Sequence, residues 1–469
     1  MIGARATTLL FGLAGARLLG AHLSVEAVGV YSLAAAVGTF VATVSELGIR
    51  NVYVRDVAQN LEAGPGLLAA FTIVKAVAAA VLLPLGVFYV ARQAAGWEGV
   101  GAGGAIGLGL VLNSVAIAWL SIARAHERFG WDAMGQVVYG AALVAAWMLI
   151  LPLWSSAAAA GTGLLAAAVV QLTFTALVVR HVFRVSPRKL VTGARLHESL
   201  DLIRRSWAYG VGAVLGIVYF RIDAVMLESS RGLHELGIYG AAYKLFEIGV
   251  SAPVAIAAVL LPSYARAVAA GPTAVAATYG ETLRRQCLLA GALGALLIGA
   301  APIIVRIVWT SRFDASAMPL VGLGVALTCS TIYSVNGAYL TALDRRRFIV
   351  WNAVGAVFVN VGTNLFAIPR WGAVGASWTT AATEGFLLVA STVVMARAAQ
   401  TPLWRLGAPV LAVVGLAVVL AWWASVAAGW GVLLLGAGVG LGFAALAVRA
   451  FLPGATPQVA AAAADIPCA

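Results

Sequence analysis

Charged residues are scarce in this chain. Only 10% of its 469 residues are Asp, Glu, Lys or Arg, whereas 62% are hydrophobic. A soluble domain carries about 25% charged residues. There are too few polar side chains to cover a soluble surface of this size. The composition therefore excludes a water-soluble globular protein and predicts a polytopic membrane protein.

Cysteines and the motifs of catalysis are lacking as well. The 3 cysteines, Cys287, Cys329 and Cys468, show no metal-ligand spacing, and an odd number gives no disulfide framework. No HExxH zinc motif, Gly-rich phosphate loop or GxSxG nucleophile elbow occurs. We therefore expect no enzyme activity, no cofactor and no metal site.

Long hydrophobic runs dominate the chain. They are about 20 residues long and rich in Gly and Ala, which is typical of tightly packed membrane helices. The alternating short segments of a membrane barrel are not seen. We predict an all-α protein with about fourteen transmembrane helices. The predicted spans are 3–23, 28–49, 66–91, 103–123, 133–153, 157–180, 207–228, 236–262, 286–309, 316–341, 348–369, 372–396, 405–425 and 430–450.

The basic residues agree with this map. With the N-terminus placed in the cytoplasm, most of the 30 Lys and Arg residues fall in inner loops or at inner ends. We therefore predict a multi-pass protein of the bacterial cytoplasmic membrane with both termini in the cytoplasm. The net charge of +12 follows this topology and favours anionic lipid heads, so it does not indicate nucleic-acid binding.

Three sequence anchors recur in the same order in the two halves of the chain. The pairs are Val28–Tyr31 with Leu236–Tyr239, Arg128–Gly135 with Arg347–Gly355, and Pro152 and Trp154 with Pro369 and Trp371. Such repetition predicts two pseudo-symmetric six-helix lobes related by an axis along the membrane normal. The substrate site then belongs at the lobe interface, near mid-membrane.

The predicted organisation has five parts. An N-terminal lobe, 1–180, is joined by a cytoplasmic linker, 181–206, to a C-terminal lobe, 207–397. Two further spans occupy 398–451, and a disordered tail, 452–469, follows. The linker is interpreted as a connection with an interfacial amphipathic helix rather than as a partner-docking site.

Four cations fall inside predicted spans, where a charge by default marks a pathway or a binding site. Arg17 and Arg221 lie in corresponding helices, and each either faces a cavity or snorkels to the interface. We favour the cavity for Arg221, and for Arg17 the two readings are equal. Lys75 lies close to the midplane, where snorkelling is hard, so we expect it to face a cavity. Lys244 is the fourth cation.

Three acids also fall inside predicted spans. Asp223 is expected to pair with another helix, because a carboxylate facing lipid is unfavourable. Glu247 is three residues from Lys244, so the two can pair on one helix face as a structural or a functional bridge. Glu384 lies near midplane and is interpreted either as a helix-bridging carboxylate or as a proton or sodium site.

Other polar and aromatic residues are interpreted as structural. Glu46 and Arg50 form an i,i+4 pair at the inner membrane surface, and Asn360 and Asn364 are expected to hydrogen-bond between helices. Aromatic residues near the predicted charges could stack on sugars, but an interfacial belt is favoured. These aromatic residues are Tyr31, Trp207, Tyr219, Tyr239 and Tyr243.

The chain resembles the polysaccharide transporter family, the oligosaccharide flippases of the MOP (multidrug/oligosaccharidyl-lipid/polysaccharide) exporter superfamily. The resemblance covers nearly the whole chain. It is carried by RLLG, VGVYSLA, ELGI and VRDVA between Arg17 and Ala58, by YFRIDAVML and LGIYGAAYKLFE between Tyr219 and Glu247, by VLLPSYARA around Pro262, and by NVGTNLFAIPRWGAVGASWTTAATE from Asn360 to Glu384. The segment before the first span is shorter than the family pattern, which bears on the depth of Arg17.

The resemblance implies a MATE-like bundle of two lobes around a cationic cavity that opens alternately to each side. Its substrate would be an undecaprenyl-diphosphate-linked oligosaccharide, moved to the outer leaflet for polysaccharide biosynthesis. By position, Arg17, Lys75 and Arg221 would contact the diphosphate and sugars. The implied partners are this substrate, membrane lipids and other polysaccharide-assembly proteins, while coupling to H⁺ or Na⁺ stays open.

Three alternative functions fit the sequence less well. A small-molecule or drug exporter of the same superfamily would favour acidic cavity residues, yet the four cations in spans at least match the three acids. A glycan polymerase or ligase would need a large outer loop with catalytic residues, and every predicted outer loop is short. A peptidoglycan-precursor flippase also has fourteen spans, but VGVYS and GIYGAAYK point to the polysaccharide branch.

Overall fold

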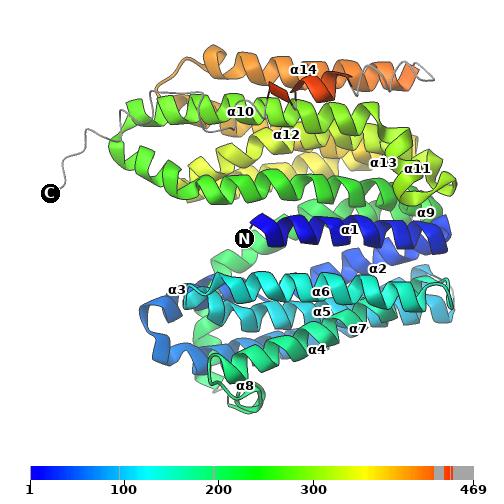
Figure 1. Ribbon diagram of the computed structural model, residues 1–469, viewed down its shortest axis with the longest axis vertical. Helices are drawn as coiled ribbons and strands as arrows, with labels where there is room; N and C mark the ends of the chain where they lie inside the picture. The colour runs from blue at the N-terminus through cyan, green and yellow to red at the C-terminus, as the bar shows by residue number, and fades with distance from the viewer. Residues whose placement is uncertain (1, 95, 194–195, 427–437, 444, 447–469) are drawn as a thin grey trace. The chain divides into compact units, whose positions relative to one another are not determined.

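The computed structural model describes residues 2–94, 96–193, 196–426, 438–443 and 445–446 (Figure 1). Within these ranges all regular structure is helical. Nine of the described helices are long and apolar enough to cross a membrane, or ten if α10 (Pro272–Gly299) and α11 (Ala301–Trp309) form one bent span. The prediction of an all-α polytopic membrane protein is confirmed.

Most helices match single predicted spans to within a few residues. They are α1 (Ile2–His22), α2 (Val25–Val44), α4 (Gly64–Gln93), α5 (Trp97–Ala125), α6 (Phe129–Ile150), α7 (Ala157–His181), α12 (Ala317–Ala342) and α14 (Leu403–Val426). Most of the predicted last span, 430–450, and all of the predicted disordered tail, 452–469, lie outside the described residues. The count of fourteen therefore stays a prediction.

Two very long helical elements each contain two predicted spans. In α9 (Leu196–Ala270) two helices meet at Gly232, and in α13 (Arg346–Ala398) two helices meet at Gly372. The φ angles are 83° and 53°, a left-handed conformation that glycine adopts without steric cost. Where the sequence predicted a loop, the structure therefore has a break in the helix at a single glycine.

The predicted linker is more helical than expected. It contains the short helix α8 (Pro187–Thr192), and α9 already begins at Leu196 and runs on into the next predicted span. A second short segment follows α2, where α3 (Ile49–Gln59) and a 3₁₀ turn, η1 (Leu61–Ala63), lead into α4.

The chain forms two compact units. The first contains Met1–Ile248, Ile304–Pro319 and Ala353–Thr379, including the 3₁₀ segment η2 (Ser311–Ser316). Within it α5 packs against α2, α4, α6 and α7, and α1 packs against α6 (Figure 1). This unit is a helical bundle, and its buried core includes Tyr53, Phe71 and Trp119. The predicted division into lobes follows sequence repetition rather than these contacts, and it stays a prediction.

The second unit contains Gly249–Ile303, Leu320–Asn352 and Thr380–Ala469. Its core is built on α10, which packs against α14. Tyr264 and Tyr339 stack with ring centroids 4.0 Å apart. The Tyr279 hydroxyl donates to Asn336 Oδ1 over 2.7 Å, and the Asn336 amide donates to Ser391 and Thr392. Buried polar groups therefore link its helices by hydrogen bonds, as expected in an apolar surrounding.

The two copies of the VGVY-type repeat contact each other inside the first unit. A Cβ at Gly29 in α2 would meet the carbonyl oxygen of Leu233, and a Cβ at Gly237 in α9 would meet the carbonyl oxygen of Val25. In the register of the repeat, Gly29 corresponds to Gly237 and Val25 to Leu233. The contact is therefore reciprocal, and glycine at both positions lets the two backbones touch.

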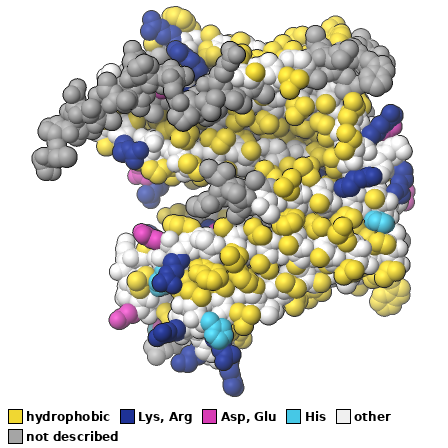
Figure 2. Space-filling view, viewed as in Figure 1, with side chains coloured by type: hydrophobic (Ala, Val, Ile, Leu, Met, Phe, Trp, Pro, Cys, Tyr) yellow, Lys and Arg dark blue, Asp and Glu magenta, His cyan; other side chains and the backbone are white. Residues whose placement is uncertain are grey.

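The exposed face of these helices is apolar. Figure 2 shows hydrophobic side chains along the length of the helices and Lys and Arg side chains near helix ends. On α4, for example, apolar residues follow one another at helical spacing, and each of them is more than half exposed. They are Val77, Val81, Leu85 and Phe88. Such a stripe is expected to face lipid.

We predict that Gly29→Ala and Gly237→Ala each lower the melting temperature of the purified protein. The added methyl would meet a backbone carbonyl, and overpacking of this kind costs about 1–3 kcal/mol. Gly104→Ala in α5 is the matched control, because a Cβ there meets no atom within 4 Å. Equal melting temperatures for all three variants would show that the glycine contact does not support the fold.

Candidate functional site

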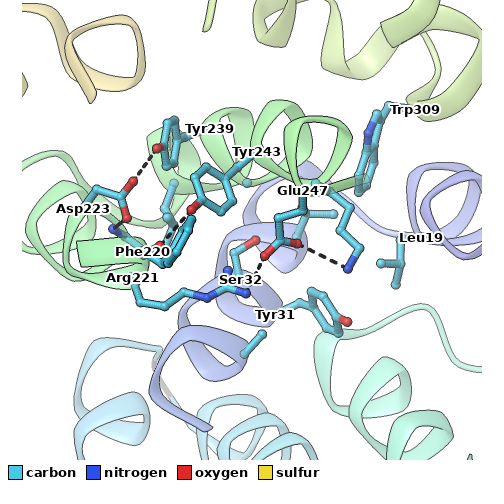
Figure 3. A pocket seen from close by; sticks show the side chains of 16 residues that line it. Leu19, Tyr31, Ser32, Phe220, Arg221, Asp223, Tyr239, Tyr243, Glu247 and Trp309 are labelled. Atoms are coloured by element: carbon cyan, nitrogen blue, oxygen red, sulfur yellow. Dashed lines mark hydrogen bonds and ion pairs between the residues drawn. The ribbon is translucent and has the colours of Figure 1, made fainter. Parts of the chain in front are cut away.

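A cavity of about 70 Å³ lies next to the glycine contact, within the first unit (Figure 3). Its walls come from α1, α2, α11 and both helices of α9. The lining residues are Leu19, Val28, Tyr31, Ser32, Ala35, Phe220, Arg221, Asp223, Ala224, Leu236, Tyr239, Gly240, Tyr243, Lys244, Glu247 and Trp309.

Helical spacing explains why these residues share one cavity. On the second helix of α9 the lining positions from Leu236 to Glu247 recur at intervals of three and four, so they form a single face. The lining positions from Val28 to Ala35 do the same on α2. The contact of Gly29 and Gly237 brings these two faces together at one end of the cavity.

One carboxylate in the cavity is shared by two cations. Arg221 Nη2 donates to Glu247 Oε1, and Lys244 Nζ lies 3.5 Å from Glu247 Oε2 (Figure 3). The Arg221 guanidinium also lies 5.6 Å from the ring centroid of Tyr243, a cation–π distance. The Lys244–Glu247 pair predicted from the sequence is present, and Arg221 joins it from the preceding helix.

The second carboxylate is held by hydrogen-bond donors instead of a cation. The Tyr239 hydroxyl donates to Asp223 Oδ2, and the Ala224 backbone amide donates to Oδ1 over 2.8 Å. Tyr239 lies in the helix after the one that carries Asp223, so this carboxylate bridges two helices as predicted. The Tyr243 hydroxyl donates to the Phe220 carbonyl over 2.9 Å and ties the same two helices together.

The charges of the cavity are therefore arranged asymmetrically. Asp223 is buried, with 3% of the residue exposed. The side chains of Arg221, Lys244 and Glu247 are 25%, 38% and 29% exposed. The cation pair with its shared carboxylate is thus the part of the cavity that a ligand can reach. In surroundings of low dielectric constant, contacts of these charges are stronger than in water.

Lys75 lies in a different place from the one expected. Its side chain is only 1% exposed, and it does not line the cavity. Lys75 Nζ donates to the Ala42 carbonyl over 3.1 Å and lies 3.5 Å from Glu46 Oε2. Glu46 also accepts from Arg50, so the predicted Glu46–Arg50 pair is present, although a turn follows α2 at this point. The structure encloses Lys75 because these oxygens satisfy its ammonium.

Two other predicted residues also lie away from this cavity. Arg17 on α1 is exposed and is not among the lining residues, so Arg17 and Arg221, which lie in corresponding helices, do not share this cavity. Glu384 is buried in the second unit, with 2% exposed, on the second helix of α13.

The positions of the aromatic residues differ in part from the favoured interpretation, an aromatic belt at the membrane interface. Tyr31, Tyr239 and Tyr243 line the cavity, whereas Tyr219 does not and Trp207 is 66% exposed. Tyr243 lies four residues before Glu247 and Tyr239 four residues before Tyr243, so helical spacing from Glu247 would have indicated the α9 tyrosines. Sequence reasoning missed Trp309, which reaches the cavity from α11 and has no local signal in the sequence.

Comparison with known proteins gives a family and a fold. The family model described as polysaccharide biosynthesis protein matches residues 4–268, more than half of the chain. A sequence search of curated proteins finds no match.

Several solved structures share the fold. The lipid II flippase MurJ in an inward closed conformation has a TM-score of 0.66 at 13% identity, over 96% of this chain and 97% of that one. An inward-facing multidrug resistance MATE family transporter has a TM-score of 0.62 at 16% identity, over 86% and 95%. A MOP superfamily transporter from Pyrococcus furiosus has a TM-score of 0.57 at 16% identity, over 87% and 93%.

We predict that Glu247→Gln destabilises the protein, because it leaves Arg221 and Lys244 without their shared counter-charge. The loss should be about 1–3 kcal/mol, below the 3–5 kcal/mol of a fully buried pair, because these side chains are partly exposed. Denaturant unfolding of the single variants and of Arg221→Gln/Glu247→Gln measures the coupling. The double variant should lose less than the sum of the singles, and strict additivity would refute the pairing.

Proposed function

The chain belongs to the polysaccharide biosynthesis protein family, and from that premise we propose that it is a flippase for lipid-linked oligosaccharides. Its substrate is an undecaprenyl-diphosphate-linked repeat unit, which it moves from the inner to the outer leaflet of the cytoplasmic membrane by alternating access. Both termini face the cytoplasm in this proposal, as the distribution of Lys and Arg suggests. Its partners are the substrate, membrane lipids and other polysaccharide-assembly proteins.

One observation carries the proposal: in a partly open cavity, the Glu247 carboxylate pairs with both Arg221 and Lys244. A diphosphate has several anionic oxygens, spaced much as the two oxygens of a carboxylate are. Arg binds phosphate oxygens through two parallel hydrogen bonds. Glu247 thus occupies the position of an internal anion when no substrate is bound. Exchange of Glu247 for diphosphate keeps both cations paired throughout, which avoids the cost of an unpaired charge in the membrane.

The tyrosines of the cavity suit the sugar part of such a substrate. Tyr31 and Tyr243 line the same space as the cation pair. A tyrosine ring combines an apolar face with a polar hydroxyl, as sugars combine apolar ring faces with hydroxyl edges. We therefore assign the diphosphate to Arg221 and Lys244 and the first sugar to the neighbouring tyrosines.

A second function is favoured by the fold likeness to a multidrug resistance transporter, namely export of small molecules coupled to H⁺ or Na⁺. A cationic drug would need a carboxylate to pair with. In the cavity, Asp223 already accepts two hydrogen bonds, and Glu247 already pairs with two cations. This arrangement favours an anionic substrate over a cationic one.

We predict that Arg221→Ala abolishes glycan export in a strain whose surface polysaccharide depends on this protein. The diphosphate would lose its bidentate partner, which we expect to reduce export at least tenfold, or about 1.4 kcal/mol in binding. Surface glycan is quantified at matched protein levels in the membrane. Arg346→Gln is the control, because Arg346 is 78% exposed and pairs only with Asp344 among the described residues.

Full export by the Arg221→Ala variant at normal protein levels would refute the role of the cation pair. A reconstituted assay separates the two functions: the protein in liposomes is given either a fluorescent lipid-linked diphosphate sugar or a cationic dye. Transport of the dye alone would favour the drug exporter and overturn the flippase.

A further inference from the structure

A second cavity of about 340 Å³ lies farther along α2, also within the first unit. Its polar lining comes from α2, the turn after it, α3 and α5. The polar side chains are Thr39, Thr43, Glu46, Arg50, Asn113 and Ser114. A volume of this size is typical of small-molecule sites in proteins.

The two cavities lie along one face of α2. Val28, Tyr31 and Ala35 line the first, and Thr39 and Ala42 continue at intervals of three and four residues along the second, with Glu46 following in the turn after α2. At about 1.5 Å per residue, Tyr31 and Thr43 are about 18 Å apart along the axis. One helix face therefore connects the two cavities across much of a membrane.

The second cavity repeats the charge arrangement of the first. Glu46 Oε2 accepts from Arg50 Nη2 and lies 3.5 Å from Lys75 Nζ. In the first cavity Glu247 likewise accepts from Arg221 and lies 3.5 Å from Lys244. A carboxylate of each cavity lining is thus shared by one Arg and one Lys, although Lys75 itself does not line the second cavity. The sequence repeat does not produce this likeness, because Glu247 corresponds to Thr39 in its register.

The second cavity differs in that its Lys is enclosed. Glu46 and Arg50 are the charged residues of its lining, while Lys75, with 1% of its side chain exposed, lies behind Glu46 and does not line the cavity. Buried Arg50 Nε has no hydrogen-bond partner in the described part of the chain. The cation that lines this cavity thus has one unused donor, which suits an added anion.

The turn that carries Arg50 is fixed in place. Leu47 and Gly48 have φ angles of 48° and 69°, so the chain turns sharply between α2 and α3. A Cβ at Gly48 would meet the backbone of Tyr209 and Gly210, which shows that the turn packs directly on α9. Only glycine fits that approach at a left-handed angle, so Arg50 is held at the edge of the cavity.

We propose that Glu46, Arg50 and Lys75 form a second phosphate station, at the end of α2 that the topology assigns to the cytoplasm. This inference rests on the proposed function and extends it. The substrate diphosphate first binds Arg50 while Lys75 retains Glu46. It then moves along the shared face of α2 to Arg221 and Lys244. Each station has its own carboxylate, so the cations stay paired before and after the diphosphate passes.

Thiol protection tests the second station directly. Thr43→Cys reports on the second cavity and Ser32→Cys on the first, in a background with Cys468→Ser, since Cys287 and Cys329 are buried. The protein is placed in phosphatidylcholine nanodiscs and labelled with a soluble maleimide, with and without a short polyprenyl diphosphate. We expect the diphosphate to slow labelling at both positions.

Charge variants then assign the protection to its residues. Arg50→Gln should raise the diphosphate concentration that half-protects Thr43→Cys at least tenfold and leave Ser32→Cys unchanged, while Arg50→Lys should restore part of the protection. Glu46→Gln should lower that concentration, because the internal competitor is gone. Arg55→Gln, in the same helix but paired with Asp56 outside the cavity, should change nothing. Unaltered protection in Arg50→Gln would overturn the proposal.

The phosphate has two sources, the substrate and the bulk lipid, and a further arm distinguishes them. Nanodiscs containing phosphatidylglycerol but no diphosphate should leave Thr43→Cys fully labelled. Equal protection by phosphatidylglycerol would identify a lipid site and overturn the station. Protection of Ser32→Cys without protection of Thr43→Cys refutes only the second station. Lack of protection at Ser32→Cys in every arm refutes the proposed function itself.

Discussion

A charge inside a membrane span is stable only beside a counter-charge or several hydrogen-bond partners, and both cavities of this chain obey that requirement. Glu247 holds Arg221 and Lys244, and Glu46 holds Arg50 and Lys75. A carboxylate shared by two cations leaves each of them less than fully neutralised. It therefore stabilises the empty protein while keeping the cations available to a stronger anion. In the proposed function, the same side chains serve folding without substrate and recognition with it.

The helix α2 links these charges to the frame of the protein. One face of α2 lines both cavities, and Gly29 joins α2 to the second helix of α9 by backbone contact. At the other end Gly48 packs on the first helix of α9. Glycines at both ends thus hold α2 against the same long element. Glu46 lies in the turn between α2 and Gly48, and Arg50 follows just beyond Gly48.

Composition and hydropathy predicted the fold class and most helix positions, because membrane spans are long and apolar and leave a strong signal. The pairing of Lys244 with Glu247 followed from helical spacing alone, and that of Asp223 followed from the cost of a lone carboxylate. The sequence could not predict which residues from distant parts of the chain meet in the folded protein. Lys75 was expected in a cavity, but its enclosure depends on how α4 lies against Ala42. Trp309 reaches the first cavity from a distant helix, and Arg17, which looked equivalent to Arg221, does not.

The reciprocal contact of Gly29 and Gly237 constrains how the two halves of the gene can diverge. Each glycine rests on the backbone next to the other copy, so a larger residue on either side disturbs both. The motif around the contact must therefore stay alike in the two halves after a duplication. Two turns farther along the helices, this restraint no longer applies. There the repeat aligns Lys244 and Glu247 with the uncharged Ala36 and Thr39. A twofold scaffold can in this way carry a charged site in one half that has no counterpart at the corresponding positions of the other.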